Sequence, residues 1–266
     1  MTQTEAQTIK AVNEPAVVRP YGLLGLILSF VGICCLAALL IGAAAGIWFF
    51  VAGEHAMQAD MAAMGLHDIN EIRKAPHHVQ MVFYSVVAVT FIAFGLATLA
   101  FARLRGGRQW REPLFWGPST GWSTGRSPWI LLVLAPVYLL VVGYGIKLIF
   151  PEFRTWFFVP QGIAGIALSF VTVVLLAPWA EELVFRGWIY SSLRQSFGIA
   201  AGVIVTAVLF ALAHTDATGL YPVLVFIPGL VMTLIREKNG SAKASFLAHA
   251  AYNCMAWLIV FFVGNS

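Results

Sequence analysis

Long, unbroken apolar runs separated by short polar segments make up most of this chain. The runs do not alternate apolar with polar residues, and several extend for 18 residues or more without a charge. Lipid offers no partner to backbone N–H and C=O groups, so runs of this kind predict transmembrane helices rather than barrel strands. We predict an all-α, polytopic transmembrane helical bundle of about seven to eight spans. Seven can be placed, at residues 21–51, 81–102, 129–146, 162–190, 199–215, 220–235 and 241–263.

The same pattern divides the chain into three regions. Residues 1–20 are polar and without periodicity, which predicts a disordered tail. Residues 21–160 contain the N-terminal transmembrane helices and their loops. Residues 161–264 contain the spans that hold most of the intramembrane polar side chains, and we predict that they form the functional core.

The composition supports a membrane protein. Hydrophobic residues make up 60% of the chain, charged residues only 11%, and the mean hydropathy is +0.83. These values lie outside the range of water-soluble globular domains. The first run is longer than the roughly 7–15 apolar residues of a secretory signal and lacks an obvious cleavage site, so we expect it to stay as an anchor.

The placement of basic residues predicts the orientation of the bundle. The sequence pI near 9.1 is compatible with nucleic-acid binding, but the cations follow the predicted loops instead. With a cytoplasmic N-terminus, 12 of the 16 Lys and Arg residues lie on the cytoplasmic side, which agrees with the positive-inside rule. We therefore expect an integral, multi-pass protein of the plasma membrane, the inner membrane in bacteria. We expect the lipid bilayer around it and no nucleic acid as partner.

Ionisable and amide side chains gather in the spans after residue 176. A charge at the bilayer centre costs roughly 2.5–3.5 kcal/mol on insertion scales, so several charges together indicate a functional site with partners or water. The group comprises Glu181, Glu182, Arg186, His214, His249 and Asn253.

The two adjacent carboxylates of the segment "EELVFR" are predicted to have different surroundings. Glu182 and Arg186 are four residues apart, in the favourable order for an ion pair on one helix face. Glu181 points about 100° away from that face and is left without the cation. An unpaired carboxylate in apolar surroundings suits a general base. The Glu182–Arg186 pair alone is equally compatible with a buried ion pair that only fixes helix packing.

Two further segments, "FALAH" and "HAAYN", place Phe210 one helical turn before His214 and His249 one turn before Asn253. A single buried histidine is more often a core residue than a functional one, and the depth of these residues therefore matters. If the fourth and fifth spans form a hairpin at residues 197–198, Glu181 and His214 each lie 16 residues from the turn, about 24 Å, and are level.

The polar residues of the seventh span are predicted to lie at a smaller depth than Glu181 and His214. His249 and Asn253 lie only 8 and 12 residues past Ser241, about 12 and 18 Å. The difference disappears if the turn between the fourth and fifth spans projects into the cytosol or if the helices tilt.

Together Glu181, His214, His249 and Asn253 are the minimum set for hydrolysing a peptide bond. Glu181 would take a proton from a water molecule that His214 orients, and would later deliver it to the leaving amine. His249 and Asn253 would donate hydrogen bonds to the developing oxyanion.

At these residues the chain resembles the CAAX prenyl protease 2 family, also called the CPBP or Abi intramembrane proteases. The family motifs E-E-x-x-x-R, F-x-x-x-H and H-x-x-x-N are present in order as "EELVFR", "FALAH" and "HAAYN", and the resemblance covers residues 176–256. It implies an intramembrane endopeptidase with Glu181, His214, His249 and Asn253 as catalytic residues and no cofactor. Glu182, Arg186 and Phe210 would support them. The implied partner is a membrane-embedded peptide or protein, and prenylated peptides are one substrate class of the family.

Two alternatives stay open, and a third is disfavoured. A zinc-dependent intramembrane protease could use the same residues as ligands, although no H-E-x-x-H is present. A serine protease is disfavoured because no G-x-S-x-G occurs. A non-catalytic membrane immunity or transport protein could also place carboxylates and histidines within the bilayer, where they serve as relays.

Overall fold

The described part of the chain is entirely helical in its regular structure, as the sequence predicts. A computed structural model describes residues 23–52, 69–106, 114, 137–139, 141–143, 145–146, 148–150, 157–215 and 219–263. The predicted tail at 1–20 and most of the predicted span at 129–146 lie outside these residues.

Four of the predicted spans correspond to single helices. The first two are α2 (Leu23–Ala52) and α5 (His77–Gly106), with the short α4 (Ile69–Lys74) before α5. The last two are α10 (Tyr221–Asn239) and α11 (Ala242–Val263). The ends of all four helices lie within a few residues of the predicted positions.

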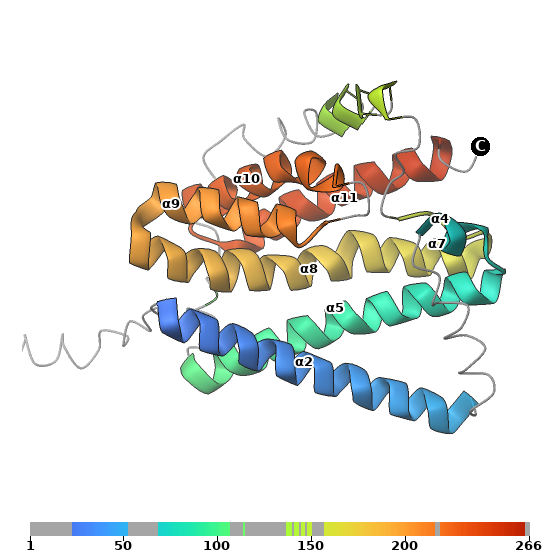
Figure 1. Cartoon of the computed structure of the whole chain (residues 1–266), viewed down its shortest axis with the longest axis horizontal. Helices are drawn as coiled ribbons and strands as arrows, with labels where there is room; N and C mark the ends of the chain where they lie inside the picture. The colour runs from blue at the N-terminus through green and yellow to red at the C-terminus, as the bar shows by residue number, and fades with distance from the viewer. Residues whose placement is uncertain are drawn as a thin grey trace, which may run out of the picture.

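The fourth and fifth predicted spans form one continuous helical path that reverses its direction. The path consists of α7 (Gly162–Phe170), η2 (Val171–Leu176), α8 (Ala177–Glu181), η3 (Glu182–Ile189) and α9 (Tyr190–Leu212). Gly198 interrupts α9 with φ 82° and ψ 177°, a conformation that only glycine adopts readily. Figure 1 shows the ribbon turning back between its gold arm and the orange arm labelled α9, so the hairpin predicted at residues 197–198 is confirmed.

The protein is an integral membrane protein. Four helical stretches of the described residues are long and apolar enough to cross a bilayer, namely Leu24–Ile47, His77–Leu104, Gly162–Leu212 and Ala242–Phe262. The third has 51 residues because it contains both arms of the hairpin, whereas one crossing needs about 20. The count of seven to eight spans stays a prediction.

The arm that carries α8 lies at the centre of the bundle. It packs on α5, and α5 packs in turn on α2, in the order that Figure 1 shows. Gly95 of α5 permits the close approach, since a Cβ there would lie 2.1 Å from Cζ3 of Trp179 in α8. Trp188 of η3 also donates to the hydroxyl of Ser29 in α2, at 2.9 Å. These contacts hold the helix that bears both glutamates against the N-terminal pair.

On the other side, the arm packs against α10 and α11. The turn end of the hairpin is tied to the end of α10 by Arg194, whose Nε and Nη2 donate to the two carboxylate oxygens of Glu237, both at 2.8 Å. Glu237 also accepts from the hydroxyl of Tyr190 at 2.7 Å. Arg194 is therefore level with the end of α10, and the reversal at Gly198 extends beyond that level.

Candidate active site

The helix changes its winding on both sides of the two glutamates. The segments η2 and η3 are π-helical, and the short α8 between them ends at Glu181. The wider winding is visible in single bonds, such as that from the N–H of Ala177 to the carbonyl of Thr172, five residues earlier. Single π turns in helices occur frequently at functional sites. Glu181 and Glu182 therefore stand at a junction between two helical registers.

Glu182 and Arg186 form the ion pair that their spacing predicts. Nη1 of Arg186 lies 2.7 Å from Oε1 of Glu182, and neither side chain is exposed. The guanidinium also reaches α10, where Nη2 donates to the carbonyl of Gly229 at 2.8 Å and Nε to the hydroxyl of Thr233 at 3.3 Å. Arg186 thereby joins the glutamate helix to α10.

The carboxylate of Glu182 is also bound by α11. Oε1 accepts from Nδ1 of His249 at 2.8 Å, and Oε2 accepts from the hydroxyl of Ser245 at 2.6 Å. Because a carboxylate only accepts, the bond places a proton on Nδ1 of His249. A fully buried charge needs such partners, and Glu182 has them from its own helix and from α11.

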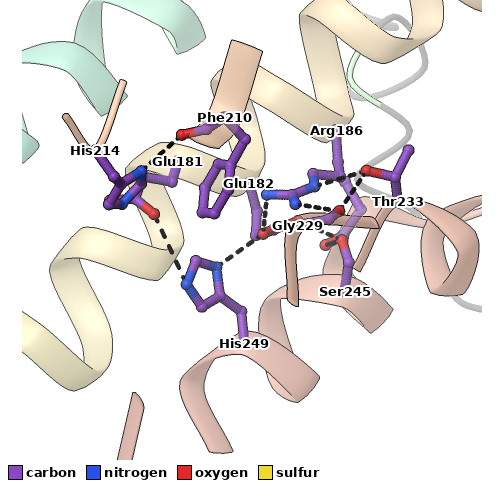
Figure 2. Close-up of polar contacts among 10 residues, drawn as sticks. Glu181, Glu182, Arg186, Phe210, His214, Gly229, Thr233, Ser245 and His249 are labelled. Carbon is purple, nitrogen blue, oxygen red and sulfur yellow. Dashed lines mark hydrogen bonds and ion pairs between the residues drawn. The ribbon is translucent and has the colours of Figure 1, made fainter. Parts of the chain in front are cut away.

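Glu181 lies on a different face and meets both histidines. Its Oε1 is 3.8 Å from Nε2 of His214, and its Oε2 is 3.7 Å from Nε2 of His249. Figure 2 shows His249 between the two glutamates, with one ring nitrogen toward each. The side chains of Glu181, His214 and His249 are 14%, 23% and 7% exposed, whereas Glu182 and Arg186 are sealed. The accessible carboxylate is thus the one without a guanidinium bond.

His214 is oriented by the turn of helix that precedes it. Its Nδ1 lies 2.7 Å from the carbonyl of Phe210, and since a carbonyl only accepts, Nδ1 is the donor. In the neutral ring Nε2 then carries the lone pair, and this atom faces Glu181.

The ring of Phe210 packs among the charged groups. Its centroid lies 4.5 Å from that of His214 and 5.8 Å from that of His249, and Cζ of Arg186 lies 4.4 Å from it. An aromatic face attracts a guanidinium at this distance. Phe210 therefore separates the Arg186 cation from His214 while it contacts both.

Asn253 bonds to the backbone of the neighbouring helical path. Its Nδ2 donates to the backbone carbonyl of Val173 in η2, at 2.8 Å. The next turn of α11 repeats the pattern, with Nε1 of Trp257 donating to the hydroxyl of Ser169 at 3.2 Å. Ser245, His249, Asn253 and Trp257 are spaced by four residues and make a polar ladder along α11 toward the helical path from Gly162 to Leu212.

Sequence reasoning missed four contributors to the site. Ser245 could have been found, because it lies one turn before His249 on the same helix face. Thr233 and the carbonyls of Gly229 and Val173 carry no such signal. Among the described residues, no group of three or more His, Cys, Asp or Glu side chains is arranged to hold a metal ion.

Comparison with known proteins places this site in a protease family. Residues 163–255, which include every predicted site residue, match the family model described as type II CAAX prenyl endopeptidase Rce1-like. The chain belongs to the Rce1-like family. This confirms the resemblance read from the three motifs, and it supports a peptidase activity at the membrane.

A protein of similar sequence is found in Escherichia coli. An "Uncharacterized 24.3 kDa protein" of that organism is 30% identical over 148 residues, which cover 53% of the present chain and 67% of the relative. No solved structure matches the present chain significantly.

Proposed function

We propose that this Rce1-like protein is an intramembrane endopeptidase that hydrolyses a peptide bond of a membrane-embedded substrate by glutamate-activated water. The observation that carries the proposal is the convergence of Nε2 of His214 and Nε2 of His249 on the two oxygens of Glu181, at 3.8 and 3.7 Å. A water molecule about 2.8 Å from both Glu181 and His214 fits this separation.

In the first step Glu181 acts as general base. It removes a proton from this water while Nε2 of His214 accepts a hydrogen bond from the second O–H and orients the oxygen. The oxygen attacks the carbonyl carbon of the substrate, the C=O bond becomes a C–O⁻ bond, and a tetrahedral intermediate forms. The proton held by Glu181 then passes to the amide nitrogen as the C–N bond breaks, which releases an acid and an amine.

His249 is the proposed donor to the oxyanion. Glu182 holds Nδ1 and so fixes the ring with Nε2 toward the reacting centre. When Nε2 of His249 also carries a hydrogen, it donates to the oxyanion from the position that Glu182 fixes. Arg186 holds that carboxylate in place.

The substrate class follows from the surroundings and the family. A site built on membrane-embedded helices suits a peptide segment that itself lies in or on the bilayer. Prenylated C-terminal peptides are a substrate class of type II CAAX prenyl endopeptidases, and we extend it to this chain as a proposal. The cytoplasmic N-terminus and the plasma-membrane location belong to the same proposal.

The direct test is cleavage of a library of membrane-tethered peptides, prenylated and unprenylated, by the purified protein in liposomes. Glu181→Gln keeps the size of the side chain but removes the base, and it should abolish cleavage. Glu237→Gln makes the same chemical change at the far end of α10 and should cleave like the parent. Equal cleavage by Glu181→Gln and parent would refute the glutamate mechanism.

A zinc protease is the second candidate, because two imidazole nitrogens face one carboxylate, although these three side chains are not arranged as a metal site among the described residues. The same cleavage assay distinguishes it. Glutamate-activated water predicts activity that survives a strong chelator and protein that contains no stoichiometric zinc, whereas the zinc mechanism predicts the opposite in both measurements. A non-catalytic immunity or transport protein would cleave nothing under any of these conditions.

A further inference from the structure

The residue after Ala177 interrupts the π-helical bonding just before Glu181. The N–H of Ala177 donates to the carbonyl of Thr172, five residues earlier. In the same register the next N–H would belong to residue 178 and would donate to the carbonyl of Val173. Residue 178 is proline, which has no N–H. The Val173 carbonyl therefore lacks its backbone donor inside an apolar bundle, where an unpaired carbonyl is costly.

Asn253 supplies the missing donor. Its Nδ2 lies 2.8 Å from the Val173 oxygen and comes from α11, 80 residues further along the chain. The side-chain amide thus replaces the backbone amide that Pro178 cannot provide. An N–H to carbonyl bond of this length is of ordinary strength, and both partners gain from it because water is scarce at this depth.

The same replacement occurs at a second proline. Pro228 lies within α10, and its absent N–H would have bonded to the carbonyl of Leu224, four residues earlier. That carbonyl accepts from the hydroxyl of Tyr138 at 2.9 Å, again from a distant segment. Two prolines inside helices of this protein are therefore each matched by a donor from another segment.

We infer that Asn253 is a positioning residue whose amide bonds to Val173 and thereby sets His249 against Glu181. Asn253 lies one turn after His249 on α11, and Pro178 lies three residues before Glu181. The bond fixes α11 against the segment that precedes Glu181. Together with the bonds of Ser245 and His249 to Glu182, it sets the height of α11, and that height contributes to the 3.7 Å between Nε2 of His249 and Oε2 of Glu181. This role differs from the oxyanion role that the motif predicts for Asn253, and it rests on the proposed peptidase function only for its activity readout.

The test is a double-mutant cycle between positions 178 and 253, because Pro178→Ala restores a backbone N–H for Val173. In the parent background, Asn253→Ala should lower the Tm by about 2–4 °C, as expected for one lost buried hydrogen bond in a chain of this size. It should also reduce kcat by about tenfold or more with KM nearly unchanged. In the Pro178→Ala background, both losses should be much smaller.

An oxyanion role gives a different pattern. Asn253→Ala would then reduce kcat equally in both backgrounds, whatever the change in Tm, and this result would overturn the inference. Repeating the Tm measurements in Glu181→Gln protein separates the two proposals, since these measurements need no activity. If Pro178→Ala yields no folded protein, Pro178→Ser supplies the same N–H and takes its place in the cycle.

Discussion

Glu182 and Arg186 lie one helical turn apart, with 2.7 Å between Oε1 and Nη1, and neither side chain reaches the surface. Both charges are buried, and each is stable in the bundle because the other neutralises it. The pair also connects three helices, because Arg186 reaches α10 and Glu182 reaches α11. The pair therefore holds these three helices together, and Glu181 beside it is the carboxylate without a guanidinium bond.

Arg186→Ala is expected to reduce the amount of folded protein sharply. The substitution leaves the Glu182 carboxylate buried without its cation, and breaking a buried pair in this way costs about 3–5 kcal/mol. Adding Glu182→Gln removes the stranded charge and should recover part of the loss. Thermal unfolding in detergent, followed by size-exclusion chromatography, measures both effects. A Tm for Arg186→Ala equal to that of the parent would contradict this account of the pair.

Alanine substitutions of His249 and His214 are expected to differ in their effect on stability but to reduce activity similarly. His249→Ala removes a donor from the buried Glu182, which costs about 1.5–3 kcal/mol for a bond to a charged group, whereas His214 bonds only to the Phe210 carbonyl and is partly exposed. Both variants should lose roughly 10²-fold or more in turnover. Tm and cleavage rates measured on the same preparations check this. A larger Tm loss for His214→Ala would reverse the assignment.

Gly198 is expected to tolerate no side chain. Its φ of 82° and ψ of 177° lie in a region that even asparagine avoids, so Gly198→Ala and Gly198→Asn should each cost about 1–3 kcal/mol. Gly240 offers a matched control, because its φ of 63° and ψ of 17° are left-handed helical and admit asparagine. Gly240→Asn should therefore unfold near the parent temperature. Similar losses for the two asparagine variants would argue against the reversal at Gly198.

Gly95→Ala is expected to push α5 away from α8. The new methyl would lie 2.1 Å from Cζ3 of Trp179, two residues before Glu181, and overpacking of this kind costs about 1–3 kcal/mol. Gly46→Ala in α2 is the control, since nothing lies within 4 Å of a Cβ there. It should be neutral or slightly stabilising, as alanine favours a helix. Thermal unfolding of both variants compares them directly, and equal Tm values would count against the close approach.

Much of the fold follows from the sequence because apolar runs and glycine are strong signals in a bilayer. The runs placed α2, α5, α10 and α11, and the hairpin at residues 197–198 made Glu181 level with His214. The mismatch in the depth of His249 disappears in the structure, where its Nε2 is 3.7 Å from Glu181. One reason is that Arg194, and not Gly198, is level with the end of α10. The turn at Gly198 therefore projects beyond the end of α10, and a projecting turn is one of the two explanations that the sequence offers for the mismatch.

The parts that sequence could not predict depend on backbone atoms. Every residue has the same carbonyl, so nothing in the letters marks Gly229 as the acceptor for Arg186 or Val173 as the acceptor for Asn253. The π-helical segments also leave no signal in the sequence, because π winding changes which backbone groups pair without changing which residues are apolar. Pro178 was the one visible sign, and it predicts an interruption without naming the donor that repairs it.

The polar ladder of α11 limits how far this helix can move. Four side chains on consecutive turns of α11 each bond to the helical path from Gly162 to Leu212, namely Ser245, His249, Asn253 and Trp257. A rotation or translation of α11 would break all of these bonds at once, so this helix is held rigidly against its neighbours. Under the proposed function, a substrate peptide that enters the site from the bilayer would then have to displace a helix other than α11.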